Sequence, residues 1–250
     1  MAKHIAAALL LLACAGGALA QAPAPRLTLM TEHSPPASMR IKGEVTGIAT
    51  DKVREMVRRA GIDYTLELLP WKRAYTVALR QTDACVFSTT RTPEREKLFK
   101  WVGPTDEAEW VLMGRADRSY ALRTLEDARS LRIGTYNGDA RDEYLRTRGF
   151  NVDPAPTDSI NPRKLLANRI DLWAAVIRRD PQSMEQHKLA GQIVPVLVFN
   201  RVRVYLACNT GVPDALIDKM NAALELMNRD GTARRIDAKY EHWTSGALTP

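Results

Sequence analysis

Short apolar runs and amphipathic segments alternate along this chain, and the alternation is the feature that most restricts its fold. Apolar runs at 27–31, 64–69 and 84–88 predict strands, and the segments 50–61 and 71–80 between them predict helices. A strand that is followed by a helix and then by another strand favours a parallel βαβ unit. The first third of the sequence therefore predicts an α/β fold.

A second α/β unit follows the first. Apolar runs at 131–135 and 170–176 predict strands, the segment 139–148 predicts a helix, and 162–168 predicts a helix that Asn161 caps. The chain then ends in two further predicted helices, at 213–228 and 232–240.

Two such units predict two lobes, each with a sheet of its own, joined by strands that cross between them. We expect residues 26–109 and 207–243 to form lobe 1, and residues 110–206 to form lobe 2.

Residues 1–20 have the pattern of a secretory signal peptide. Lys3 and His4 precede an apolar run over residues 5–13, and Ala-Leu-Ala at 18–20 fits a signal-peptidase site. We therefore expect export and cleavage after Ala20. The alternative is a lipoprotein signal, in which Cys14 is acylated and anchors the chain to the membrane.

The remaining cysteines and charges narrow the classes of function. Cys85 and Cys208 lie in apolar segments, and they are either two buried thiols or a disulfide, which an exported location permits. The three histidines after residue 20 lie far apart, so we expect no metal site, and we expect no cofactor. The net charge of +7 is spread along the chain without a basic block, which argues against nucleic acid as a partner.

The loop after the predicted strand 84–88 carries the most informative motif, Thr-Arg-Thr-Pro-Glu-Arg at 90–95. Parallel sheets bind ligands beyond the carboxyl ends of their strands. Thr92 and Pro93 predict the start of a helix, which places Arg95 in the first turn, where a cation opposes the helix dipole. Arg95 with the Thr90 hydroxyl is therefore a candidate carboxylate clamp. The alternative is that the arginines of this loop form surface ion pairs with Glu94, Glu96 or Asp106.

The same loop belongs to a series of motifs that resembles the periplasmic solute-binding proteins of family 3, the polar amino acid type. Thr-Pro-Glu-Arg-Glu-Lys at 92–97, followed by Phe-Lys-Trp-Val-Gly-Pro at 99–104, is similar to the T-x-E-R signature of that family. Further similar segments follow in the family's order, at 31–36, 46–51, 125–134, 169–173, 205–207 and 228–232. The resemblance covers nearly the whole chain after the predicted signal peptide.

The resemblance implies the type II periplasmic binding protein fold, in which two α/β lobes close around a ligand in the cleft between them. It also implies the function of that family, which is to capture a small solute and to deliver it to an ABC transporter permease in the inner membrane. We accordingly expect a periplasmic monomer without catalytic residues, whose ligand is an amino acid or another small carboxylate.

By position, the resemblance implies ligand-binding residues on both lobes. Arg95 would bind the ligand carboxylate with Thr90, and Arg91 is the alternative cation. Trp71 falls on an aromatic wall position, although a large aromatic residue is also typical of a core, and Glu32 falls on the acidic position of the first loop. The second lobe would contribute Asn137, Gly138, Asp139 and Ala140, with the alternative that Asp139 is only a helix N-cap.

Two departures from the family pattern concern the ligand. Family members commonly hold the α-ammonium group of the ligand with an Asp, and the matching position here is Val176. The first loop has residues 33–37 where aromatic side chains are frequent in the family. The ligand is therefore either a small carboxylate without an amine, or a compound whose amine contacts Glu32 or Asp139.

Two other classes of function remain open. A sensory or accessory ligand-binding module uses the same fold. An enzyme that resembles the periplasmic dehydratases of this fold would use Glu32 or Asp139 as an acid or base. The chain has no G-x-S-x-G, no H-E-x-x-H and no Ser/His/Asp constellation, so catalysis would rest on analogy of fold.

Overall fold

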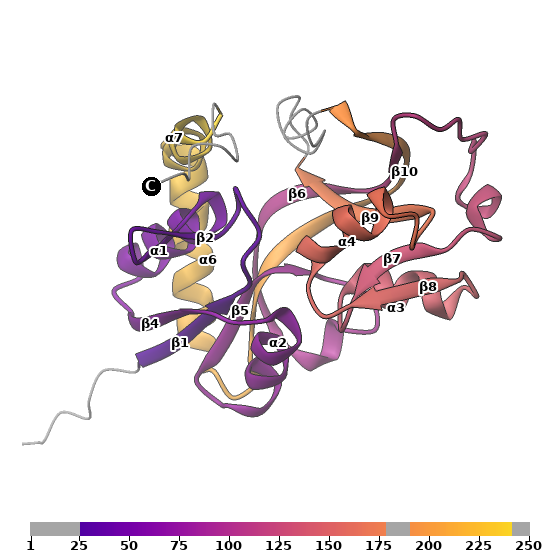
Figure 1. Cartoon of the computed structure of the whole chain (residues 1–250). Coiled ribbons are helices and arrows are strands. Elements are labelled where there is room, and N and C mark those ends of the chain that lie inside the picture. Colours follow the sequence, from indigo (N-terminus) through magenta and orange to yellow (C-terminus); the bar gives the residue numbers. More distant parts are fainter. Residues whose placement is uncertain (1–25, 179–190, 242–250) are drawn as a thin grey trace, which may run out of the picture.

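A series of eight hydrogen-bonded strands forms the framework of the protein, in the order β4-β1-β5-β10-β6-β9-β7-β8. The computed structural model describes residues 26–178 and 191–241 (Figure 1). The predicted signal peptide, with Cys14, and the end of predicted lobe 1 lie outside the described residues. No helix within these two ranges is long and apolar enough to cross a membrane.

The first half of the series confirms the predicted βαβαβ unit. Its parallel strands are β1 (Arg26–Thr31), β4 (Asp63–Leu68) and β5 (Ala84–Thr90), with β1 in the middle. Helices α1 (Ile48–Arg59) and α2 (Trp71–Arg80) connect them. The C-terminal helices α6 (Asp214–Arg229) and α7 (Thr232–Lys239) return to this half and pack against α1 (Figure 1).

The core of the first half follows from helical periodicity. Val53, Met56 and Val57 repeat at the spacing of one helix face, and all three side chains are buried. They pack with Met220 and Met227 of α6 in one apolar cluster. The sequence did not predict the small hairpin of β2 (Met39–Ile41) and β3 (Glu44–Thr46), which forms a separate two-stranded sheet.

The second half contains the other predicted α/β unit. Strands β7 (Ile133–Tyr136), β8 (Val152–Ala155) and β9 (Leu172–Arg178) are parallel to one another. The elements that connect them are α3 (Ala140–Thr147), the 3-10 turn η3 (Asp158–Ile160) and α4 (Asn161–Leu166). A further 3-10 turn, η2 (Leu125–Ala128), precedes β7.

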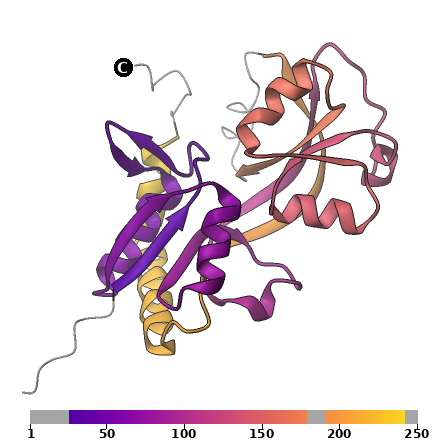
Figure 2. The same cartoon turned by 60° about the horizontal axis from the view of Figure 1, so that its bottom comes forward.

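Two long strands connect the halves. β6 (Lys100–Arg115) and β10 (Ile193–Cys208) have 16 residues each and run antiparallel from the pair Lys100–Cys208 to the pair Arg115–Ile193. Figure 2 shows this pair of strands passing from one group of elements to the other. The expectation that each lobe has a separate sheet is wrong, because the strands of both halves are hydrogen-bonded into one sheet. The strands form a single series, because β10 also pairs with β5 and β6 also pairs with β9. The lobe boundaries stay a prediction.

Two predicted helix starts need correction. The segment after Thr92 does not form an α-helix; it forms turns and the 3-10 turn η1 (Glu96–Leu98), because β6 already begins at Lys100 and leaves little room. Asn161 does not cap α4 from outside but is its first residue, and its side-chain amide donates to the Thr135 carbonyl oxygen over 2.9 Å.

The structure joins Cys85 and Cys208 in a disulfide, which decides between the two alternatives that the sequence left open. Cys85 lies on β5 and Cys208 at the end of β10, directly opposite each other in neighbouring strands. Both side chains are fully buried in the apolar cluster of the first half.

Candidate ligand-binding site

A cavity of about 110 Å³ lies between the two halves. We call it the cleft cavity. The first half contributes the loop after β1, helix α1 and the end of β5, and the second half contributes the end of β7, the start of α3 and a position on β9. The crossing strands β6 and β10 line it between them. The side chains that matter for its chemistry are Glu32, Lys52, Ser88, Thr90, Trp110, Tyr136, Asp139, Arg141 and Val176.

Glu32 and Tyr136 form a direct contact between the halves. The Tyr136 hydroxyl donates to Oε1 of Glu32 over 2.6 Å. Burial raises the pKa of Tyr136 far above its usual value, so this hydroxyl stays neutral and remains a donor. Burial also raises the pKa of Glu32 from 4.5 to about 8, although the hydrogen bond from Tyr136 acts in the opposite direction. At neutral pH the Glu32 carboxyl is therefore largely protonated.

Arg141 is the most deeply buried charged side chain at this cavity, with 2% of its surface exposed. Its Nε donates to Oδ1 of Asp139 over 2.6 Å, Nη1 to the Ala174 carbonyl oxygen over 2.8 Å, and Nη2 to Oδ2 of Asp158 over 3.3 Å. The guanidinium also lies 5.2 Å from the centre of the Tyr136 ring. Two carboxylates and a carbonyl thus compensate for its burial, as a buried charge requires.

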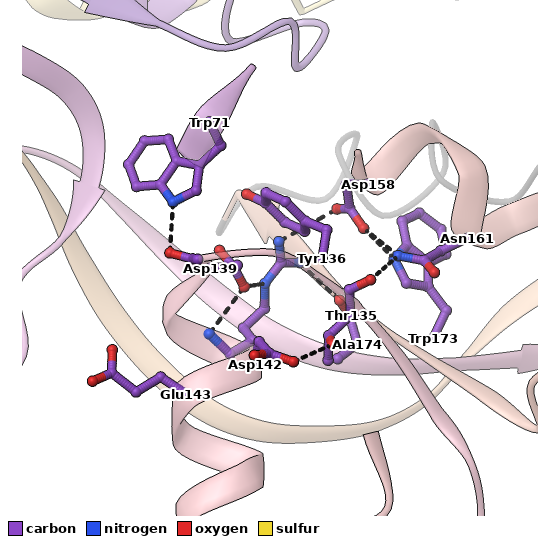
Figure 3. A network of polar contacts seen from close by, with 12 residues as sticks. Trp71, Thr135, Tyr136, Asp139, Asp142, Glu143, Asp158, Asn161, Trp173 and Ala174 are labelled. Carbon is purple, nitrogen blue, oxygen red and sulfur yellow. Dashed lines mark hydrogen bonds and ion pairs between the residues drawn. The ribbon is translucent and has the colours of Figure 1, made fainter. Parts of the chain in front are cut away.

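Asp158 extends the hydrogen-bond network of Arg141 to further residues of the second half (Figure 3). Its Oδ1 accepts hydrogen bonds from Nε1 of Trp173 over 2.8 Å and from Nδ2 of Asn161 over 3.0 Å. Close by, the Thr135 hydroxyl donates to Oδ1 of Asp142 over 2.6 Å. Because its members come from β7, α3, η3, α4 and β9, the network holds the cavity wall of the second half in one arrangement.

The Gly138 carbonyl oxygen is a second contact between the halves. Nε1 of Trp71 donates to it over 2.8 Å, and Nη2 of Arg95 donates to it over 3.1 Å. Arg95 also lies 3.6 Å from a carboxylate oxygen of Glu143 and 4.8 Å from the centre of the Tyr75 ring. Side chains of the first half therefore converge on the loop that begins α3.

The ligand-binding residues predicted from the sequence line the cleft cavity, contact the Gly138 carbonyl oxygen, or lie elsewhere. Glu32, Thr90 and Asp139 line the cleft cavity, and so does Val176. Trp71 and Arg95 are buried beside it and contact Gly138.

The other predicted residues lie elsewhere. Arg91 forms the surface ion pair that was the alternative for this loop, with Glu96 as its partner. Asn137 is exposed, and Ala140 lines a neighbouring pocket. Asp139 is the N-cap of α3, because its carboxylate accepts from the Arg141 amide over 2.9 Å.

Sequence reasoning missed Tyr136 and Arg141. The sequence did contain a signal for Arg141. It is a cation in the first turn of a predicted helix, where a positive charge opposes the helix dipole, and this was also the reason for choosing Arg95. Tyr136 directly precedes the predicted loop, but nothing in its local pattern distinguishes it from a core residue.

The raised pKa of Glu32 predicts a pH dependence of stability. A carboxyl whose pKa is higher in the folded protein favours folding most at low pH, and this contribution is lost as the pH rises through the range from 4.5 to about 8. Part of the Glu32 side chain remains exposed, and solvent screening there reduces the effect of the pKa shift on stability. We therefore expect the free energy of unfolding of the wild type to fall by about 2 kcal/mol relative to that of Glu32→Gln between pH 5 and pH 8. Urea unfolding of both proteins at several pH values measures it, and parallel pH profiles would contradict the assignment.

Residues 27–242 match the sequence pattern of the bacterial extracellular solute-binding proteins, family 3, and the chain belongs to this family. It is 21% identical to the L-cystine-binding protein TcyJ of Escherichia coli (strain K12) over 201 residues, which are 79% of this chain and 75% of that protein. It is 24% identical to the ABC transporter arginine-binding protein 1 of the same strain over 221 residues, which are 83% of this chain and 86% of that protein.

Among solved structures, a histidine kinase sensor domain with similarity to periplasmic binding proteins superimposes with a TM-score of 0.77 at 18% identity, over 87% of this chain and 96% of that one. At this identity the likeness shows the fold, which is that of the periplasmic binding proteins.

Proposed function

We propose that this protein captures a small carboxylate-bearing solute, an amino acid or a related compound, in the cleft cavity and delivers it to an ABC transporter permease in the inner membrane. The observation that carries the proposal is a cavity with ionisable side chains from both halves, Glu32 on one side and Asp139 with Arg141 on the other. A ligand that contacts both sides favours the arrangement in which the halves are close together. The protein would work as a monomer in the periplasm and leave its ligand chemically unchanged.

Arg95 is our candidate for the group that binds the ligand carboxylate. Only 3% of its surface is exposed, and in the described part of the chain its Nε has no hydrogen-bond acceptor. Its other contacts across the halves are a carbonyl oxygen at 3.1 Å and a carboxylate at 3.6 Å, and neither uses the bidentate fork of the guanidinium. A ligand carboxylate that approaches from Thr90 would supply the missing acceptor.

The test begins with a thermal-shift screen of amino acids, opines and small dicarboxylates. A hit stabilises the folded protein by about 2.7 kcal/mol at a hundredfold excess over Kd. For the best hit, we expect Arg95→Ala to weaken binding by about 2 to 5 kcal/mol, mostly through faster dissociation, because the carboxylate is left unpaired. Isothermal titration calorimetry measures the loss.

Arg91→Ala is the matched control, because Arg91 lies in the same loop and already has Glu96 as its partner. Arg95→Lys keeps the charge but not the fork, so it should recover only part of the affinity. If Arg91→Ala weakens binding and Arg95→Ala does not, the carboxylate belongs to Arg91.

An enzymatic function is the second candidate, and one observation favours it. A protonated carboxyl in a cavity, as the raised pKa of Glu32 provides, is suited to act as a general acid. Asp139 is less suited, because it is engaged with the helix N-terminus and with Arg141. Incubation of each screening hit with the protein, followed by NMR of the small molecule, separates the two functions. A product that wild type forms and Glu32→Gln does not would replace solute capture with catalysis.

A further inference from the structure

A second and larger cavity, of about 390 Å³, lies next to the cleft cavity and shares Thr90 and Trp110 with it. We call it the arginine pocket. Its walls are residues 90–94 of the first half, helix α3 with Arg148 directly after it in the second half, and residues 200–203 and 205 of the crossing strand β10. Four arginines line it, Arg91, Arg148, Arg201 and Arg203. Of the residues discussed for solute binding, it includes Thr90, Arg91, Trp110, Ala140 and Glu143, and it includes neither Glu32 nor Arg95.

The arginines come from all three walls. Arg201, Arg203 and Tyr205 occupy every second position of β10, so the pleat of the strand places these three side chains on one face. Arg91 lies against the Tyr205 ring, with its guanidinium carbon 5.3 Å from the ring centre. On the opposite wall, Arg148 stacks on Tyr144 with a corresponding distance of 3.6 Å. Stacking on an aromatic ring limits the freedom of a guanidinium and prepares it for an anion.

The charges of the pocket are only partly balanced. The lining contains four arginines and two glutamates, Glu94 and Glu143. Arg91 is paired with Glu96, and Arg201 is paired with Glu109 over 3.0 Å. Within residues 26–178 and 191–241, neither Arg148 nor Arg203 takes part in an ion pair. Arg148 donates from Nη1 to the Tyr144 carbonyl oxygen over 3.1 Å and interacts electrostatically with Glu94 of the same lining. Arg148 and Arg203 are thus two cations on different walls that form no ion pair in the described part of the chain, and each has further N–H donors for a ligand.

We propose that the arginine pocket binds a small organic anion with two or three carboxylate groups. Guanidinium groups on several walls match separate carboxylates, and the aromatic side chains Trp110, Tyr144 and Tyr205 offer a surface to the carbon skeleton between them. Such an anion contacts the first half through Arg91, the second half through Arg148 and the crossing strand through Arg203. Its binding therefore joins both halves from outside the cleft cavity.

Citrate is the probe, and isothermal titration calorimetry at constant ionic strength is the measurement. We expect wild type to bind citrate at millimolar or lower concentration, with an affinity that falls as salt is added. Arg148→Gln and Arg203→Gln should each weaken binding about tenfold, and the double variant should weaken it about a hundredfold. Both side chains are exposed, so the thermal unfolding midpoints of the variants should stay close to that of the wild type.

Arg234→Gln is the control for net charge, because Arg234 is an exposed arginine on α7 outside the pocket. It should bind citrate as the wild type does. The proposal is overturned if wild type does not bind citrate, or if the double variant binds it as well as Arg234→Gln does. Equal affinities for citrate and inorganic phosphate would overturn the assignment to a polycarboxylate. No cleft ligand is used, so failure here leaves the proposed solute capture untouched.

Discussion

Replacing Arg141 with methionine is expected to lower the free energy of unfolding by about 3 to 5 kcal/mol. Methionine fills similar space but leaves Asp139 and Asp158 without the cation that pairs with both, and it leaves the Ala174 carbonyl oxygen without its donor. Removing one partner of a buried charge network costs more than the network contributes, because the remaining charges stay desolvated. Urea denaturation at neutral pH measures the loss.

Arg146→Met is the matched control for this experiment. Arg146 lies on the same helix and pairs with Asp142 over 2.9 Å, but its side chain is about half exposed. Surface pairs at this helical spacing contribute only about 0.3 to 0.5 kcal/mol. If the two variants lose the same stability, water reaches the Arg141 network and the burial in the structure is not maintained in solution.

Removing the disulfide is the second large effect that we expect. The bond joins residues 123 positions apart, and closing so long a loop restricts the unfolded chain strongly. The double variant Cys85→Ala/Cys208→Ala should therefore lose about 2 to 5 kcal/mol of unfolding free energy. Thermal and urea unfolding with and without a reducing agent measure it.

The reducing agent separates the bond from the packing of its sulfur atoms. It should destabilise the wild type by most of the amount that the double variant loses, and it should leave the double variant unchanged. A wild type that is indifferent to full reduction would show that the two cysteines act as two buried apolar side chains.

Much of the first half of the fold could be predicted from local pattern. Strand β1 and helix α2 match the predicted segments within one residue, because apolar periodicity and a nearby proline mark their ends. The length of β10 could not be predicted in this way. Only its last residues, 205–208, are continuously buried. Ile193 at its start is also buried, but the residues between them are partly buried or exposed where the strand crosses between the halves.

The candidate site was predicted less completely than the fold. Glu32, Thr90 and Asp139 line the cleft cavity because they lie at or just beyond the carboxyl ends of strands, where a sheet of this kind binds its ligands. The role of Arg141 depends on Asp158 and Ala174, which lie 17 and 33 residues away in sequence. No local pattern encodes such contacts. The contact of Arg95 with Gly138 is hidden from the sequence for the same reason.

The pairing of β6 with β10 has a consequence for any separation of the halves. The two strands are hydrogen-bonded to each other along their length, so they bend together as one ribbon and neither strand swings alone. The ladder is interrupted by register shifts at 195/197, 198/200 and 204/206, where fewer hydrogen bonds resist a change of curvature. Flexing is therefore easiest at these three places. The last of them lies between Val204, in the wall of the cleft cavity, and the disulfide-bonded end of the strand. The cavity therefore borders one of the three interruptions of a ribbon whose end is covalently fixed.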